Sequence, residues 1–401
     1  MSDWDELDLG LTVDSEEAEH RASLWRALEE ERVMPEAEHL GLLSGLLDED
    51  ILRLRTLWMK LAQAVRLELL IALAHLAEAD FTMDFSAVFR IALRDHDADI
   101  RVVALRGLGE VEDVRLVPEF VHMLEQDPSI EARRAAAEGL GKYVLLGELQ
   151  KLRPDPFHHT VRALCDAFLD RTQDLLVRRR ALESMAYTGE HGVPEIIESA
   201  YAESDEGMRH SAVMAMGRSA DARWGEIVQR ELLSPSREMR FEATRACGEL
   251  QLRESVNELV ALTDDVDERI QTMALWALGQ IGGNQARRTL QRFAGNSDQA
   301  LAGAAEEALQ ELEFFHGDLS SFFGPPERYD GETDGAWQMP GLGDLVDDEE
   351  EAPNAGRRYA DQDEEFDDEE DLDLWDDDDE DEVDDLDIWD IIDEDDDDEW
   401  D

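Results

Sequence analysis

The segments SREMRFEATRACGELQ, residues 236–251, and DERIQTMALWALGQIGG, residues 267–283, decide the fold of this chain. Each contains an apolar residue, then a polar slot, then alanine three residues after the slot, a small residue six after it and a large apolar residue seven after it. In the first segment these are Met239, Arg240, Ala243, Ala246 and Cys247. The apolar members form one stripe of a helix with 3.6 residues per turn. Each segment therefore predicts a short amphipathic helix.

The pattern occurs eight times between Val65 and Ala308, and its slot recurs every 31 residues in the last four steps. A period near this length indicates repeated helical hairpins, which stack because one hairpin cannot bury its own apolar face. We therefore expect an all-α, armadillo-like solenoid, a right-handed α-α superhelix whose inner surface holds another macromolecule. The slot falls at Arg66, Arg101, Arg133, Arg178, Arg209, Arg240, Gln271 and Ala302.

Two further columns of the repeat predict how its helices pack. Three residues after the slot, alanine stands in seven of the eight repeats, which indicates close contact between helices. Eight residues after the slot, glycine stands in five repeats, and we expect the helix to end there, because glycine adopts the left-handed conformation at little cost. These glycines are Gly109, Gly141, Gly217, Gly248 and Gly279.

A third column stands in the turn before each slot. Six residues before the slot, six of the eight repeats carry a residue that favours turns or helix caps. Carboxylates in this column and arginines in the slot predict a ladder of ion pairs between neighbouring hairpins, with a structural rather than a catalytic role. The six residues are Asp95, Asp127, Thr172, Ser234, Asp265 and Asn296.

Together with DPSIEARRAAAEGLGKYV, residues 127–144, the two opening segments resemble HEAT-like repeat proteins, particularly the 31-residue type of the phycobilisome lyases. The resemblance covers about residues 50 to 313. The order of the repeats and the acidic C-terminal tail is also similar to that of bacterial HEAT-repeat proteins of the green non-sulfur type. This second resemblance implies no particular activity. For function, the resemblance implies either a subunit that grips a bilin and its protein acceptor, or an oxygenase that modifies a lysine with two irons held by His-Glu dipeptides.

Charge divides the chain. The net charge is −63, and residues 344–401 hold 35 acids and two arginines. Blocks of like charge repel one another and bury too little apolar surface to fold alone. We therefore expect an acidic disordered N-terminus at 1–14, a helical cap at 15–49 with helices starting near Ser15 and Glu36, the solenoid at 50–313, a Pro/Gly linker at 314–343 and a disordered acidic tail at 344–401. The chain shows no signal peptide and no apolar run of bilayer length, so a cytoplasmic location is expected.

Catalytic and metal-binding motifs are weak. No histidine precedes a glutamate, and no nucleophile stands at a recognisable spacing from a base. The sequence Glu-x-x-His occurs several times, as chance predicts for a chain with 100 acids. We therefore expect no metal, no cofactor and no catalytic residues, with the lyase or oxygenase subunit as the alternative. Three of these matches are Glu17 with His20, Glu36 with His39, and Glu119 with His122.

The inner ridge of the second helices provides the candidate binding residues. Positions one and five after the slot lie one helical turn apart, outside the buried stripe. There the repeats gather arginine, methionine and aromatic side chains, which are typical of binding hot spots. The alternative is that the two aromatic residues pack between hairpins. The candidates are Arg134, Arg179, His210, Met214, Phe241, Arg245 and Trp276.

The tail carries apolar residues among its acids, a composition found in motifs that dock into grooves. We expect a non-catalytic protein-binding scaffold or chaperone-like adaptor. Its tail either folds back onto the inner ridge, where Arg134, Arg179 and Arg245 supply the opposite charge, or recruits basic proteins. A purely solvating tail, or one that mimics nucleic acid by its charge, is an alternative; direct binding of nucleic acid or membrane is not expected. The apolar residues are Leu372, Trp375, Leu386, Ile388, Trp389, Ile391, Ile392 and Trp400.

Overall fold

The computed structural model describes residues 9–190 and 192–316, with side chains from residue 18 to residue 314. The chain divides into two compact units, Met1–Arg328 and Tyr329–Asp401, and every described residue belongs to the first. The described residues are helical and contain no strand. The acidic tail at 344–401 and the linker beyond residue 316 lie outside the described part, as do the apolar tail residues. No helix of the described part is both long and apolar enough to span a bilayer.

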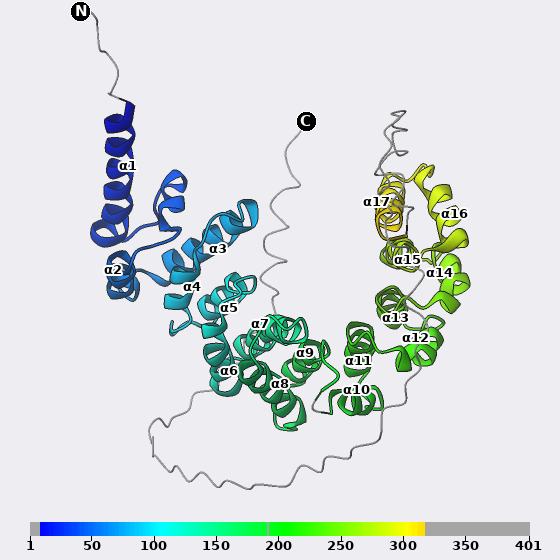
Figure 1. Cartoon of the computed structure of the whole chain (residues 1–401). Helices are drawn as coiled ribbons and strands as arrows, with labels where there is room; N and C mark the ends of the chain where they lie inside the picture. The colour runs from blue at the N-terminus through cyan, green and yellow to red at the C-terminus, as the bar shows by residue number, and fades with distance from the viewer. Residues whose placement is uncertain (1–8, 191, 317–401) are drawn as a thin grey trace, which may run out of the picture. The chain divides into compact units, whose positions relative to one another are not determined.

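Eight helical hairpins follow one another, and the second helix of each carries the repeat slot. In Figure 1, the second helices α11, α13, α15 and α17 form one row, and the first helices α10, α12, α14 and α16 form a second row along one side of it. The hairpins are α2 (Asp48–Trp58) with α3 (Gln63–Ala79), α4 (Ser86–Ala92) with α5 (Ala98–Gly107), α6 (Val117–Gln126) with α7 (Ile130–Glu148), α8 (Pro154–Leu169) with α9 (Leu175–Met185), α10 (Val193–Tyr201) with α11 (Glu206–Arg218), α12 (Gly225–Glu231) with α13 (Arg237–Glu249), α14 (Val256–Leu262) with α15 (Glu268–Ile281), and α16 (Gly283–Ala294) with α17 (Gln299–His316).

Short elements precede and join the hairpins. At the N-terminal end stand α1 (Leu9–Arg26), a π-helical turn η1 (Ala27–Glu31) and a 3₁₀ helix η2 (Ala37–Leu43). Helix α1 thus begins before the expected start at Ser15, because nothing between Leu9 and Ser15 breaks a helix; Gly10 there costs only about 1 kcal/mol relative to alanine. Three 3₁₀ turns lead into first helices: η3 (Val114–Leu116), η4 (Ala222–Trp224) and η5 (Arg253–Ser255).

Side-chain caps set the start of most second helices. In six of them the residue before the helix accepts a hydrogen bond from a backbone N–H of the first turn, which satisfies a donor that has no partner inside the helix. Proline stands in the first turn of α6, α8 and α10, where its missing N–H costs nothing. The capping residues are Asp97, Ser129, Asp174, Asp205, Ser236 and Asp267.

The alanine column packs as predicted, since Ala104 and its six equivalents are fully buried. Four of the five glycines in the glycine column lie within two residues of a helix end, but none of them adopts the left-handed conformation that was expected. Gly217, Gly248 and Gly279 lie inside their helices, and the left-handed residues follow three positions later, at Ala220, Gln251 and Gly282. The glycines are needed for close packing instead: a Cβ on Gly279 would lie 3.1 Å from Ala308 Cα on the next second helix.

The predicted ion-pair ladder is present. The slot arginine of one hairpin reaches a carboxylate in the turn of the next hairpin. Its guanidinium also donates to a backbone carbonyl of its own hairpin, as Arg101 Nη1 does to Asp95 O at 2.9 Å. Each rung therefore fixes a turn and the spacing between two hairpins. Arg133 instead donates to Gln173, and Arg209 lies 3.8 Å from Glu231. The regular rungs are Arg66 with Asp95, Arg101 with Asp127, Arg178 with Glu203 and Arg240 with Asp265, at 2.7, 2.7, 2.9 and 2.9 Å.

Candidate functional site

A groove of about 550 Å³ runs across the second helices α13, α15 and α17, and we call it the α13–α17 groove. Its volume lies within the range of ligand sites, about 300–1,000 Å³. Apolar side chains make its floor. They are Phe241 from α13, Met273 and Trp276 from α15, and Leu301, Ala304 and Ala308 from α17.

The repeat explains why these side chains meet. Phe241 follows its slot by one residue and Trp276 follows its slot by five, so both project from the exposed edge of their helices. The ring of Trp276 leans over Gly248 of α13, where a Cβ would lie 2.6 Å from its Cζ3. Phe241 and Trp276 are half-buried and pack against the core. Contact between hairpins therefore holds both rings while leaving part of each facing the groove.

The rim of the α13–α17 groove is acidic. Its lining includes four carboxylates and, among described residues, one guanidinium, that of Arg269. Arg269 lies 5.6 Å from the centre of the Phe241 ring and donates to Asp267, so its charge is partly compensated. Glu311 accepts a hydrogen bond from Gln280, whereas the carboxylates of Glu268 and Glu307 are exposed. The four acids are Glu268, Asp298, Glu307 and Glu311.

The other predicted ridge residues lie outside the groove. Arg245 was expected to offer free positive charge, but its guanidinium lies 3.1 Å from Glu242 and 3.4 Å from Glu249 on its own helix. These contacts are misaligned for hydrogen bonding, so they act as ion pairs alone. The remaining candidates lie on earlier helices. Arg134 is on α7, Arg179 is on α9 and donates to Ser211 at 2.9 Å, and His210 and Met214 are on α11.

Burial raises the pKa of Glu249 and of Glu242, against the opposing charge of Arg245. A carboxyl group whose folded-state pKa is raised destabilises the fold when ionised, and this penalty disappears as the pH falls towards the unfolded-state pKa. We therefore expect Glu249→Gln to raise the melting temperature at pH 7 and to have a smaller effect near pH 4.5.

The control for this prediction is Glu238→Gln. Arg237 lowers the pKa of Glu238 to about 2, and both groups are on the surface of the same helix. This control should not stabilise the protein at pH 7. A lower melting temperature for Glu249→Gln at pH 7 would mean that its pairing with Arg245 outweighs the cost of burial.

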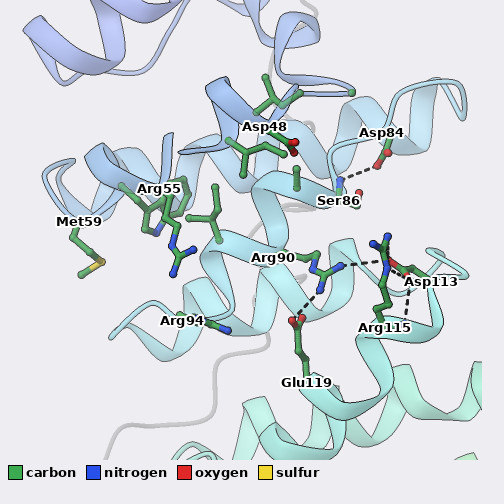
Figure 2. A pocket seen from close by; sticks show the side chains of 16 residues that line it. Asp48, Arg55, Met59, Asp84, Ser86, Arg90, Arg94, Asp113, Arg115 and Glu119 are labelled. Atoms are coloured by element: carbon green, nitrogen blue, oxygen red, sulfur yellow. Dashed lines mark hydrogen bonds and ion pairs between the residues drawn. The ribbon is translucent and has the colours of Figure 1, made fainter. Parts of the chain in front are cut away.

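A second hollow, of about 680 Å³, lies near the N-terminal end, against α2, α4 and the turn before α6. Figure 2 shows Arg90 between Asp113 and Glu119, with Arg115 also reaching Asp113. The lining holds four arginines and four carboxylates. Because its charges compensate one another and its central arginine is engaged, this hollow is a weaker binding candidate than the α13–α17 groove.

The described residues hold little for covalent or metal chemistry. Burial raises the pKa of Cys165 to about 11 and that of Cys247 to about 12, so neither thiol ionises near neutral pH. Among the described side chains, one group could hold a metal ion: His20, Glu38 and His39 at the N-terminal end. The sequence contained both histidines in Glu-x-x-His matches, but nothing in the spacing predicted that they would meet.

Stacked hairpins, a buried alanine column and a ladder of ion pairs define an α-solenoid repeat scaffold. A model of HEAT repeats matches residues 86–165 and 226–310. The chain is a HEAT-like repeat protein. None of the curated proteins matches the chain.

Solved structures are similar in fold. Human deoxyhypusine hydroxylase is 18% identical, with a TM-score of 0.30 over 76% of this chain and 99% of that one. A chain from the complex of CpcE and CpcF of phycocyanin lyase from Nostoc sp. PCC7120 is 20% identical, with a TM-score of 0.38 over 57% of this chain and 94% of that one. The YibA protein of E. coli is 18% identical, with a TM-score of 0.35 over 59% and 96%. At these identities the likeness concerns the fold alone.

Proposed function

We propose that this chain is a non-catalytic protein-binding scaffold or adaptor, and that its α13–α17 groove binds a client segment with an apolar anchor flanked by lysine or arginine. The observation that carries the proposal is the groove itself, an apolar floor with an acidic rim. Tryptophan and other aromatic side chains dominate binding hot spots, because they bury a large area with few rotatable bonds.

A protein segment fits this groove better than a small molecule does. The groove is assembled from three successive second helices, so it extends along the row of hairpins. An amphipathic helix can place side chains at three- and four-residue spacing along such a surface. Because Phe241 and Trp276 are held by packing between hairpins, little side-chain freedom is lost when a client binds.

The charge of the rim favours a basic client. Exposed carboxylates such as Glu268 and Glu307 attract cations and raise association rates. The same rim repels the acidic tail, and Arg245, which was expected to supply charge that attracts the tail, is already paired with two glutamates. We therefore assign the tail at 344–401 to the recruitment of basic partners rather than to occupation of this groove.

The first test measures binding of a synthetic amphipathic peptide of about 15 residues, carrying one tryptophan, several leucines and several lysines, to the full chain by fluorescence anisotropy. Trp276→Ala should weaken binding about 30-fold, the loss typical of a hot spot of about 2 kcal/mol. Phe81→Ala is the control, because Phe81 is a fully exposed aromatic residue away from the groove. Equal affinities for both variants would overturn the proposal.

A second pair of variants separates the groove from the general negative charge of the chain. Glu306 and Glu307 are neighbouring exposed residues on α17, and of the two only Glu307 lines the groove. Both Glu→Lys changes alter the net charge equally, so the acidic tail attracts the lysine peptide to the same extent in the two variants. Glu307→Lys should weaken binding of the lysine peptide several-fold more than Glu306→Lys does. Equal effects would show that the peptide responds to net charge and not to the groove.

A further inference from the structure

We infer that His20, Glu38 and His39 form a site for a divalent cation of the zinc class, which fastens helix α1 to the 3₁₀ helix η2. The two imidazoles and the carboxylate each offer one ligand atom, and these atoms all lie within 4.8 Å of one another. Two histidines and one carboxylate are a ligand set that zinc accepts, with water in the fourth position. The site is independent of the α13–α17 groove and of the proposed function.

The geometry needs small side-chain movements to reach coordination. Bonds of about 2.0–2.1 Å in a tetrahedron place ligand atoms roughly 3.3 Å apart. His39 Nε2 already lies 3.6 Å from Glu38 Oε1, and the rings of His20 and His39 have their centres 5.0 Å apart at an angle of 44°. His39 is 4% exposed and held in place, while His20 and Glu38 are exposed and free to rotate towards it.

Hydrogen bonding alone does not account for this arrangement. The distance of 3.6 Å between His39 and Glu38 exceeds that of a hydrogen bond, and the two rings meet at a tilt instead of stacking. An imidazole offers a metal one nitrogen lone pair, so the two rings supply two ligand atoms. A cation between them would join both rings and the carboxylate in one ligand set.

The position of the site suggests what a bound cation would do. Helix α1 packs on η1 and η2, and Arg21 of α1 also lies 2.8 Å from Asp50 of the first hairpin. A metal that bridges His20 on α1 and His39 on η2 would add a second attachment on the same helix. We therefore expect the N-terminal cap to become more protected when the metal binds.

The test is a zinc titration of the full chain, stripped of metal beforehand, in competition with a chromogenic chelator. The chelator removes the weak binding that the many carboxylates provide. One equivalent of Zn²⁺ should bind in competition with the chelator. His20→Ala should weaken that binding by more than about 100-fold, since loss of a ligand costs at least as much as loss of an outer-shell partner. The control is His75→Ala, an exposed histidine of α3, which should leave binding unchanged.

Hydrogen exchange provides a second measurement that does not depend on the buried His39. Backbone amides of α1 should exchange more slowly with Zn²⁺ in the wild-type chain and in His75→Ala, but not in His20→Ala. Zinc binding of equal strength in wild type and His20→Ala would overturn the inference. The inference would also be overturned if neither the wild-type protein nor His20→Ala took up Zn²⁺ in the presence of the chelator.

Discussion

Replacing Asp127 by alanine should lower the free energy of unfolding by about 3–5 kcal/mol, the cost of leaving one partner of a buried ion pair alone. Asp127 accepts two hydrogen bonds from Arg101, at 2.8 Å from Nε and 2.7 Å from Nη2. Both side chains are at least nine-tenths buried. The carboxylate also accepts from the backbone N–H of Ser129 at 2.9 Å, so its loss frees a turn donor too.

Denaturant titration followed by circular dichroism would measure this loss. The control is Asp166→Ala, which removes an exposed carboxylate of α8 and should stay within about 0.5 kcal/mol. The double variant Arg101→Met with Asp127→Leu should recover part of the stability, because it leaves no unpaired buried charge. A double variant that is less stable than Asp127→Ala would contradict this explanation. It would mean that the attraction between Arg101 and Asp127 stabilises the protein by more than the cost of burying Arg101 without a partner.

Ala243→Leu is expected to destabilise the protein by roughly 1–3 kcal/mol or more, because overpacking forces side chains and backbone to shift. Ala243 is fully buried on α13, which packs against α11 on one side and α15 on the other. The control, Arg237→Leu, changes a side chain that is 66% exposed and pairs with its neighbour Glu238. Melting temperatures compare the two, and equal shifts would mean that the buried stripe of α13 has been assigned to the wrong face.

The periodic features of this fold could be predicted because they depend on one helix and its nearest neighbour. The alanine column and most rungs of the ladder follow from residue spacing alone, as Arg240 with Asp265 illustrates. The glycine column was misread because two causes favour glycine at the end of a helix. Glycine can be needed there for a left-handed backbone conformation, or because another helix approaches closely. Only the structure distinguishes the two causes, by placing Ala308 beside Gly279.

The groove was predicted in part. Phe241 and Trp276 were found from the ridge positions, but Met273 and Leu301 were not, because each contributes from the side of its helix that faces a neighbour. Arg245 was assigned a free charge that it does not have. Its partners stand three residues before and four residues after it, at the spacing of intrahelical ion pairs, so the sequence already contained the signal.

The ladder ends before the last hairpin, and this gives the row of hairpins unequal stiffness. At that joint the slot holds Gln271, whose amide donates to Asp265 O in its own turn and reaches no carboxylate of the α16/α17 hairpin among the described residues. An uncharged joint resists bending less than a buried ion pair does. Helix α17, which forms one wall of the α13–α17 groove, therefore stands on a joint without a charged rung. We expect it to shift more readily than its neighbours and so to accommodate clients of different size.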